Sequence, residues 1–177
     1  MEEKSYKEFL HSITTFIFDV DGVLTDGQLY VRSNGELERV MNVKDGYALK
    51  TAIDKGYQVC IISGGKNEGV RKRLEGLGIQ DIYLGVSQKT IVLEEYMKTH
   101  SLAAEQIVYM GDDVPDYEVM QKVGMPCCPQ DAVQEIKSIS RYISHKKGGN
   151  GAVRDILEQV MKVQGKWSLL HADAQNH

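Results

Sequence analysis

Two carboxylates one residue apart, Asp19 and Asp21, end a short apolar run at residues 14–18, and a glycine follows them. In an α/β protein, ligands bind at the carboxyl ends of the strands. An unpaired carboxylate is very costly to bury, so two of them at such a point indicate a partner of opposite charge. The pattern predicts a bound cation, a catalytic pair, or both.

Polar residues follow other expected strands, or begin an expected helix, in the same manner. They are Ser63 and Gly64 after residues 57–62, Lys89 in a first helical turn, and Asp112 and Asp113 after residues 107–110. Carboxylate oxygens suit Mg²⁺, which often binds alongside a phosphate. A hydroxyl, glycine amides and a lysine suit phosphate oxygens. The carboxyl ends of parallel strands share one edge of a sheet, so this set predicts magnesium-dependent chemistry on a phosphate group.

The elements that must position these residues alternate between strand and helix, which predicts an α/β fold with a parallel sheet in three layers. The expected strands are residues 14–18, 57–62, 82–84, 107–110 and 125–128, and the expected helices are residues 2–11, 47–55, 88–98, 115–123, 131–137 and 152–162. A further basic helix carries Val70, Leu74 and Leu77 on one face. Residues 28–41 alternate around Ser33-Asn-Gly35, which predicts a β-hairpin inserted after the first acidic pair.

The composition of the chain limits the number of domains and the classes of partner that it can have. The chain has 177 residues, 42% hydrophobic and 26% charged, which fits one soluble domain over residues 1–165 and a polar, flexible tail over 166–177. A net charge of −4 argues against nucleic-acid binding. No apolar run approaches the ~20 residues of a membrane span, and the N-terminus lacks a signal-peptide pattern. Cys60, Cys127 and Cys128 form neither a disulfide framework nor a zinc spacing. We expect a cytoplasmic protein without membrane or nucleic-acid partners.

Four motifs, spread over roughly residues 13–155, together resemble those of the haloacid dehalogenase (HAD) superfamily. They are Asp19-Val-Asp-Gly-Val-Leu-Thr-Asp26, Ser63-Gly64, Lys89 and Gly111-Asp-Asp-Val-Pro-Asp116. The resemblance implies a Rossmann-like core in which Asp19 is a nucleophile that becomes phosphorylated and Asp21 is the general acid and base. It also implies that Asp19, the backbone carbonyl of Asp21, and Asp112 hold Mg²⁺. Ser63 and Lys89 would bind the transferring phosphoryl group, and Asp113 would support the metal or Lys89.

The chain leaves no room for a large cap domain, because the insert after the first motif is a single hairpin. Among capless members it is similar to the phosphatases of 3-deoxy-D-manno-octulosonate 8-phosphate (KDO 8-phosphate), through Asn42-Val-Lys-Asp-Gly46 and Gly148-Gly-Asn-Gly-Ala-Val-Arg154. This resemblance implies hydrolysis of a phosphorylated sugar acid in lipopolysaccharide biosynthesis. It also implies a homotetramer whose hairpins meet at its centre and whose neighbouring subunits complete each site. The implied substrate contacts are Asp21, Asn42, Val43, Lys44, Asp45, Gly46, Lys50, Gly64, Gly65, Lys66, Arg73, Lys89 and Asp113.

One position departs from this pattern. Many family members have arginine directly after the Ser-Gly of the second motif, whereas this chain has Gly65 followed by Lys66. Lys66 is a candidate for the substitute charge. Relatives that act on nine-carbon, sialic-acid-type phosphates often carry an acidic residue in this loop, so Gly65 argues against that substrate.

Three alternatives remain open at this point. The first is a phosphatase of a nine-carbon nonulosonate 9-phosphate. The second is a non-catalytic, tetramerising HAD-like domain, which the intact motif residues oppose. The third concerns the glycine-rich residues 146–151 alone, which read either as a flexible linker or as an anion-binding lid.

Overall fold

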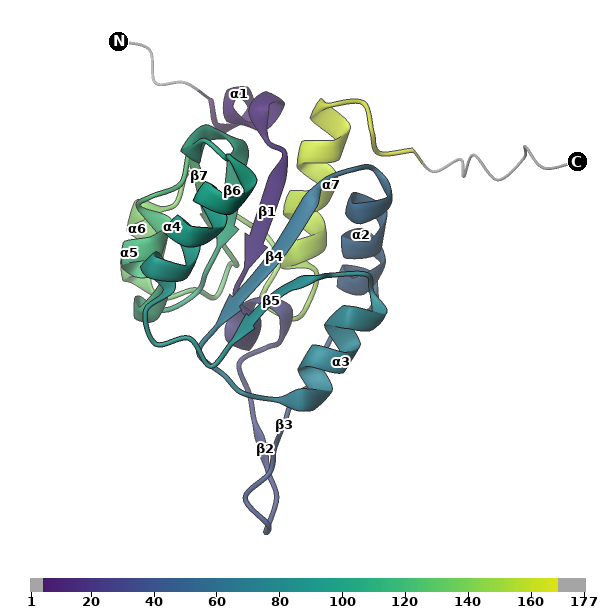
Figure 1. Cartoon of the computed structure of the whole chain (residues 1–177), viewed down its shortest axis with the longest axis vertical. Coiled ribbons are helices and arrows are strands. Elements are labelled where there is room, and N and C mark those ends of the chain that lie inside the picture. The colour runs from purple at the N-terminus through teal and green to yellow at the C-terminus, as the bar shows by residue number, and fades with distance from the viewer. Residues whose placement is uncertain (1–4, 169–177) are drawn as a thin grey trace, which may run out of the picture.

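The computed structural model describes residues 5–168 and is built around one parallel sheet (Figure 1). The sheet has the strand order β5-β4-β1-β6-β7-β8, and every neighbouring pair is parallel. Its strands are β1 (Thr15–Phe18), β4 (Gln58–Ser63), β5 (Asp81–Leu84), β6 (Ile107–Met110), β7 (Met125–Cys128) and β8 (Tyr142–Ile143). Because β1 lies between β4 and β6, the residues that follow it are flanked by the ends of both neighbours.

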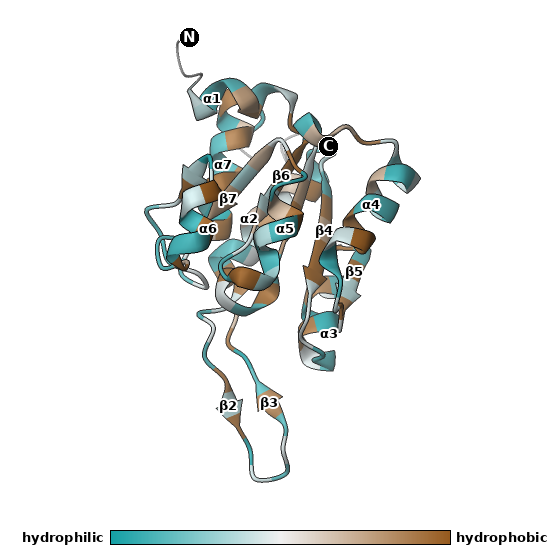
Figure 2. Cartoon of the chain, turned by 90° about the vertical axis from the view of Figure 1, so that its left-hand side faces the viewer, coloured by the Kyte–Doolittle hydropathy of each residue, from teal (hydrophilic) through white to brown (hydrophobic). Residues whose placement is uncertain are grey.

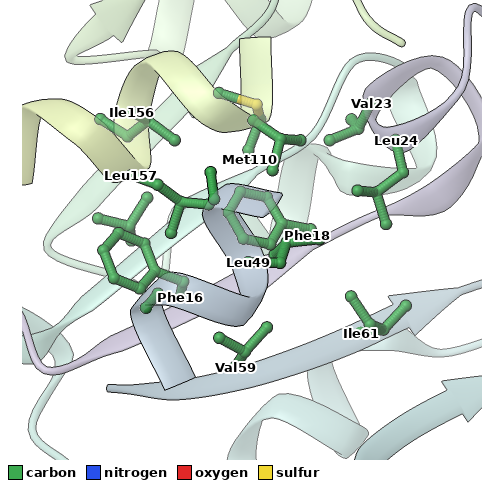
Figure 3. Packing of buried hydrophobic residues seen from close by; sticks show 14 of the residues in the cluster. Phe16, Phe18, Val23, Leu24, Leu49, Val59, Ile61, Met110, Ile156 and Leu157 are labelled. Atoms are coloured by element: carbon green, nitrogen blue, oxygen red, sulfur yellow. The ribbon is translucent and has the colours of Figure 1, made fainter. Parts of the chain in front are cut away.

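Helices cover both faces of the sheet, as expected for three layers. They are α1 (Tyr6–Phe9), α2 (Val43–Asp54), α3 (Glu68–Gly76), α4 (Lys89–His100), α5 (Tyr117–Met120), α6 (Gln134–Ile139) and α7 (Ala152–Val163). Side chains alternate along β1, so Phe16 and Phe18 pack in a core with α2 and α7 (Figure 3). Ile17 points to the opposite core, which includes Leu93 of α4 and Ile136 of α6. The α/β fold class expected from the sequence is therefore confirmed.

The hairpin comprises β2 (Tyr30–Val31) and β3 (Leu37–Glu38) and projects beyond the sheet (Figures 1 and 2). Its paired part is much shorter than the expected range of residues 28–41. Tyr30 and Val31 are exposed, so these apolar residues of the hairpin do not pack on the rest of the chain in a way that would stabilise longer strands. The paired part of the hairpin is tied to α3 where Asn67, the N-cap of that helix, donates from Nδ2 to the Leu37 carbonyl of β3 at 2.9 Å.

Several helix boundaries differ from the expected ones. Helix α2 begins at Val43 instead of residue 47, because the Asn42 side chain accepts from the Lys44 amide at 2.8 Å and caps the helix. The expected helix 115–123 is a 3₁₀ turn, Val114–Asp116, followed by the single turn of α5. Near the N-terminus, α1 covers only part of residues 2–11, and residues 2–4 of that expectation lie outside the described range.

The glycine-rich residues 146–151 pack against the loop that follows β1. The Gly149 amide donates to the Val23 carbonyl at 2.9 Å. A Cβ atom on Gly148 would lie 1.8 Å from the Gly22 carbonyl oxygen, so only glycine permits this approach. The segment braces the loop from the side of α7, an arrangement that neither the linker nor the lid interpretation described.

The end of the chain is described only in part. Lys166 and Trp167, at the start of the expected tail, pack close to the fold: Lys166 lies over the Tyr57 ring at 4.5 Å, and Trp167 packs against the core of α2 and α7. Residues 169–177 of that expectation lie outside the described range. Between residues 5 and 168, no helix has the length and apolar character needed to span a membrane.

Candidate active site

Asp19 stands directly after β1, the central strand. Its amide continues the ladder by donating to the Met110 carbonyl at 3.1 Å, and its Oδ1 accepts from the Val20 amide at 2.6 Å. The chain then turns through Gly22, which has φ +85°. A Cβ at Gly22 would lie 1.9 Å from Asp112 Oδ2, so this glycine allows the Asp112 carboxylate to approach the loop after β1.

Lys89 reaches Asp19 from the first turn of α4. Its Nζ lies 2.8 Å from Asp19 Oδ2 and 2.7 Å from Asp116 Oδ1, and its side chain is almost completely buried. Burial lowers the pKa of Lys89, but the charges of the two carboxylates outweigh this effect and raise the pKa above its usual value. Lys89 is therefore held as a cation beside the carboxylate of Asp19.

Asp116 is a site residue that the sequence reasoning missed. It is fully buried and accepts hydrogen bonds from the Tyr109 hydroxyl at 2.9 Å and the Asp112 amide at 3.3 Å, besides its contact with Lys89. The signal for it was its place in the fourth motif, one turn after Asp112. Asp113, which was predicted to support the metal or Lys89, is exposed, and its Oδ1 accepts from the Val114 amide at 2.8 Å, whereas the carboxylate that contacts Lys89 in this place is Asp116.

Three carboxylates form a cluster that fits a divalent metal. One oxygen from each of Asp19, Asp112 and Asp116 lies within 4.8 Å of the others. Burial, together with the charges of Asp19 and Asp116, raises the pKa of Asp112 to about 8. Burial and Asp116 raise the pKa of Asp19 to about 6, although Lys89 acts in the opposite direction. Such a crowded set of hard oxygen donors matches the preference of Mg²⁺.

Ser63 closes the site from the end of β4. It is buried, and its Oγ accepts a hydrogen bond from the Gly65 amide at 3.3 Å. A cavity of about 360 Å³ brings the predicted motif residues together. Its lining includes Asp19, Asp21, Ser63, Gly64, Gly65, Lys89, Asp112, Asp113 and Asp116.

Asp21 is paired with a residue that was not expected in the site. Arg39, at the base of the hairpin, donates from Nε to Asp21 Oδ1 at 2.8 Å and from a terminal nitrogen to Oδ2 at 3.1 Å. Hydrogen bonding to Asp21 raises the pKa of Arg39, despite an opposing effect of burial. No sequence pattern pointed to this contact, because Arg39 lay within an expected strand of an exposed hairpin.

The other predicted substrate contacts lie away from this cavity within the chain. Asn42 caps α2, Asp45 is buried and accepts from the Arg154 amide at 2.9 Å, and Lys50 pairs with Asp54 at 3.8 Å. Arg73 lies against Gly46, where a Cβ would come within 2.6 Å of its guanidinium. Val43 and Lys44 are exposed in the first turn of α2. Lys66 and Arg73 line a separate cleft of about 1010 Å³ between the hairpin and α3, which Arg39 also lines.

The parallel sheet and the acidic site at its carboxyl edge define a haloacid dehalogenase-like hydrolase, and the family model of that description matches residues 78–157. The chain is 39% identical to the KDO 8-phosphate phosphatase KdsC of Salmonella typhi over 155 residues, which is 88% of this chain and 82% of the relative. The chain belongs to this KdsC family of haloacid dehalogenase-like hydrolases.

Solved structures agree with this assignment. The KDO 8-phosphate phosphatase of Moraxella catarrhalis, in complex with magnesium, phosphate and KDO, superposes with a TM-score of 0.87 at 32% identity, covering 90% of this chain and 92% of that one. The cobalt-bound phosphatase of Haemophilus influenzae superposes with a TM-score of 0.88 at 34% identity, covering 93% and 96%.

The contrast between Asp116 and Asp113 can be measured by unfolding. Asp116→Ala removes a buried partner of Lys89 and Tyr109, so we expect the free energy of unfolding to fall by about 2–4 kcal/mol. Asp113→Ala removes only an exposed cap, and we expect a loss of about 1 kcal/mol or less. Urea titrations of both variants with excess Mg²⁺ measure the difference. Equal losses would contradict the role assigned to Asp116.

Proposed function

We propose that this protein is a Mg²⁺-dependent phosphatase that hydrolyses KDO 8-phosphate to KDO and inorganic phosphate. The observation that carries the proposal is the pairing of Asp19 with Lys89 inside a cavity that also contains Ser63 and Asp112. This arrangement offers a nucleophile, a phosphate-binding cation and metal-binding oxygens in one place. The relative from Moraxella catarrhalis, with magnesium, phosphate and KDO bound, supports both the metal and the substrate.

Asp19 would attack the phosphorus atom and become phosphorylated, while the bond from phosphorus to the sugar oxygen breaks. Lys89 and the Ser63 hydroxyl would bind the phosphoryl oxygens as charge develops on them. Asp19, the backbone carbonyl of Asp21, and Asp112 would hold Mg²⁺. The bound cation would neutralise the crowded carboxylates and the phosphate, so that Asp19 can approach.

Asp21 would handle the protons. In the first step it donates a proton to the departing sugar oxygen, and in the second it removes one from the water that attacks the phosphorylated Asp19. Asp21 lines the cavity together with Gly65, and it stands two residues after the nucleophile Asp19. This position allows it to face the leaving group without displacing the nucleophile.

The sugar acid itself would be bound by the surrounding predicted contacts, from this chain and from a neighbouring copy. Gly64, Gly65 and Asp113 lie at the cavity, and Lys66 and Arg73 lie in the adjacent cleft. Asn42, Val43, Lys44 and Lys50 lie outside the cavity lining of their own chain, which fits a site shared between subunits. Asp45 and Gly46 are buried within α2 and would act on the substrate only by supporting these neighbours. We place this reaction in the cytoplasm, in lipopolysaccharide biosynthesis, with residues 1–165 as one hydrolase domain.

The catalytic proposal is tested by replacing the nucleophile. Asp19→Asn retains the size of the side chain but removes its nucleophilic charge, so Mg²⁺-dependent phosphate release should fall below detection. Glu94→Gln is the control for loss of a carboxylate charge, because Glu94 lies outside the cavity lining, with its side chain 59% exposed and paired with Lys122. Release of phosphate from KDO 8-phosphate measures both. Full activity of Asp19→Asn would contradict the mechanism.

The same assay distinguishes the substrate. We expect kcat/KM for KDO 8-phosphate to exceed that for a nine-carbon nonulosonate 9-phosphate. The reverse order would favour the nine-carbon reading. Absence of hydrolysis of either ester by the wild-type protein would favour a non-catalytic, tetramerising domain.

We also propose a homotetramer assembled through the hairpin. Tyr30, Val31 and Val40 are each more than 60% exposed, which is unusual for three apolar residues so close together. Light scattering should give a mass of about four times 19.9 kDa. Val31→Glu should lower this mass, because the substitution would place a charge in the interface that the hairpins form between subunits. A monomeric wild-type mass would contradict the shared site.

A further inference from the structure

Arg39 connects the hairpin to the catalytic loop, the segment after β1 that carries Asp19 and Asp21. Its guanidinium is nearly buried, with 6% of the side chain exposed, and it meets both carboxylate oxygens of Asp21. A two-point contact of this kind fixes the orientation of a carboxylate as well as its position. The remaining terminal nitrogen of Arg39 donates to the Leu37 carbonyl at 3.0 Å, which fixes the guanidinium itself.

Arg32, a second arginine of the hairpin, makes no such contact with the loop after β1 among the contacts of the described residues. Arg32 also pairs with an acid, since its terminal nitrogen lies 2.7 Å from Glu38 Oε1. That pair is within the hairpin, and the Arg32 side chain is 58% exposed. Such exposed pairs contribute little. Of the two arginines, Arg39 alone connects the hairpin to the catalytic loop.

Gly65 provides the space that this contact requires. A Cβ atom at Gly65 would lie 3.1 Å from Asp21 Oδ2 and 3.2 Å from the terminal nitrogen of Arg39. Both distances are tighter than ordinary van der Waals contact, so a side chain at this position would push against the ion pair. The glycine at position 65 and the arginine at position 39 therefore form one structural unit with Asp21.

We propose that Arg39 is a positioning residue that holds Asp21 in the orientation needed for proton transfer to and from the substrate. The proposal rests on the phosphatase function proposed above. The shorter contact, from Nε to Oδ1, holds the carboxylate in place. Oδ2 is the oxygen nearer to Gly65, which lines the cavity with Asp21, and its contact with Arg39 is the longer one. The proton transfer is therefore assigned to Oδ2.

The proton balance follows from this assignment. A proton on Oδ2 passes to the sugar oxygen as the phosphorus–oxygen bond breaks, and Oδ2 then accepts a proton from the attacking water. During both transfers Arg39 keeps its bond to Oδ1, so the guanidinium neither gains nor loses a proton. Because Arg39 belongs to the hairpin, the position of the hairpin also determines the orientation of Asp21.

The leaving group provides the test. A primary alkyl phosphate needs a proton on its departing oxygen, whereas p-nitrophenyl phosphate releases a stabilised anion without one. Arg39→Met should lower kcat/KM for KDO 8-phosphate, or for another alkyl phosphate that the wild type hydrolyses, by about 10- to 100-fold. The loss should fall on kcat, and kcat/KM for p-nitrophenyl phosphate should change by less than about threefold. Arg39→Lys should recover part of the activity, because lysine retains the charge but not the two-point contact.

Two further variants make the test specific. Arg32→Met is the matched control on the same hairpin and should retain wild-type rates on both esters. Gly65→Ala should reproduce the selective loss on the alkyl phosphate. Combining it with Arg39→Met should add little, because both changes disturb the same ion pair. Light scattering on each variant verifies that the assembly is unchanged.

The contrary results are equally distinct. Equal losses on the two esters would mean that Arg39 serves the fold, and a higher KM at unchanged kcat would mean that it binds substrate; either result overturns the proposal. If Arg39→Met behaves like Arg32→Met while the wild type is active, the role of Arg39 fails and the phosphatase function stands. If the wild type hydrolyses no phosphate ester, both proposals fall.

Discussion

The buried contact of Lys89 with Asp19 and Asp116 is the interaction on which the site depends. Each partner comes from a different part of the sheet edge: Asp19 follows β1, Asp116 follows β6, and Lys89 begins α4. A carboxylate with no partner in this position would be too costly to bury, and so would an ammonium group. The fold must therefore bring the three elements together to place any one of these charges, and this requirement links the stability of the sheet edge to its chemistry.

This one cation does not balance the carboxylates around it. Asp19, Asp112 and Asp116 gather within a few ångströms, and burial together with their mutual repulsion raises the pKa values of Asp19 and Asp112. Gly22 allows the approach of Asp112, and residues 146–151 brace the loop from behind. The protein thus maintains a local excess of negative charge, which is the environment that a divalent cation stabilises.

Sequence reasoning could predict the sheet and the motif residues, because each motif ends or begins a strand or helix with strong periodicity. It did not predict Asp116 as the partner of Lys89, since two adjacent acids in the motif, Asp112 and Asp113, offered no basis for choosing a third. Arg39 was missed for a different reason: its contact joins the hairpin to a residue eighteen positions earlier, which no local pattern encodes. The start of α2 was placed too late because the capping role of Asn42 was not recognised.

The most direct test of this account is the response of thermal stability to Mg²⁺. Saturating Mg²⁺ should raise the Tm of the wild-type protein by about 5–10 °C, since the ligand binds the folded state alone. At about pH 9, where Asp112 with its pKa of about 8 is largely ionised, Asp112→Asn should melt higher than the wild type without metal, because one repelling charge is gone. The variant should also lose most of the Mg²⁺ response. Asp113→Asn should retain the response. If Mg²⁺ does not change the Tm of the wild-type protein, or if Asp112→Asn keeps the full increase of Tm on adding Mg²⁺, the central role of the carboxylate cluster is contradicted.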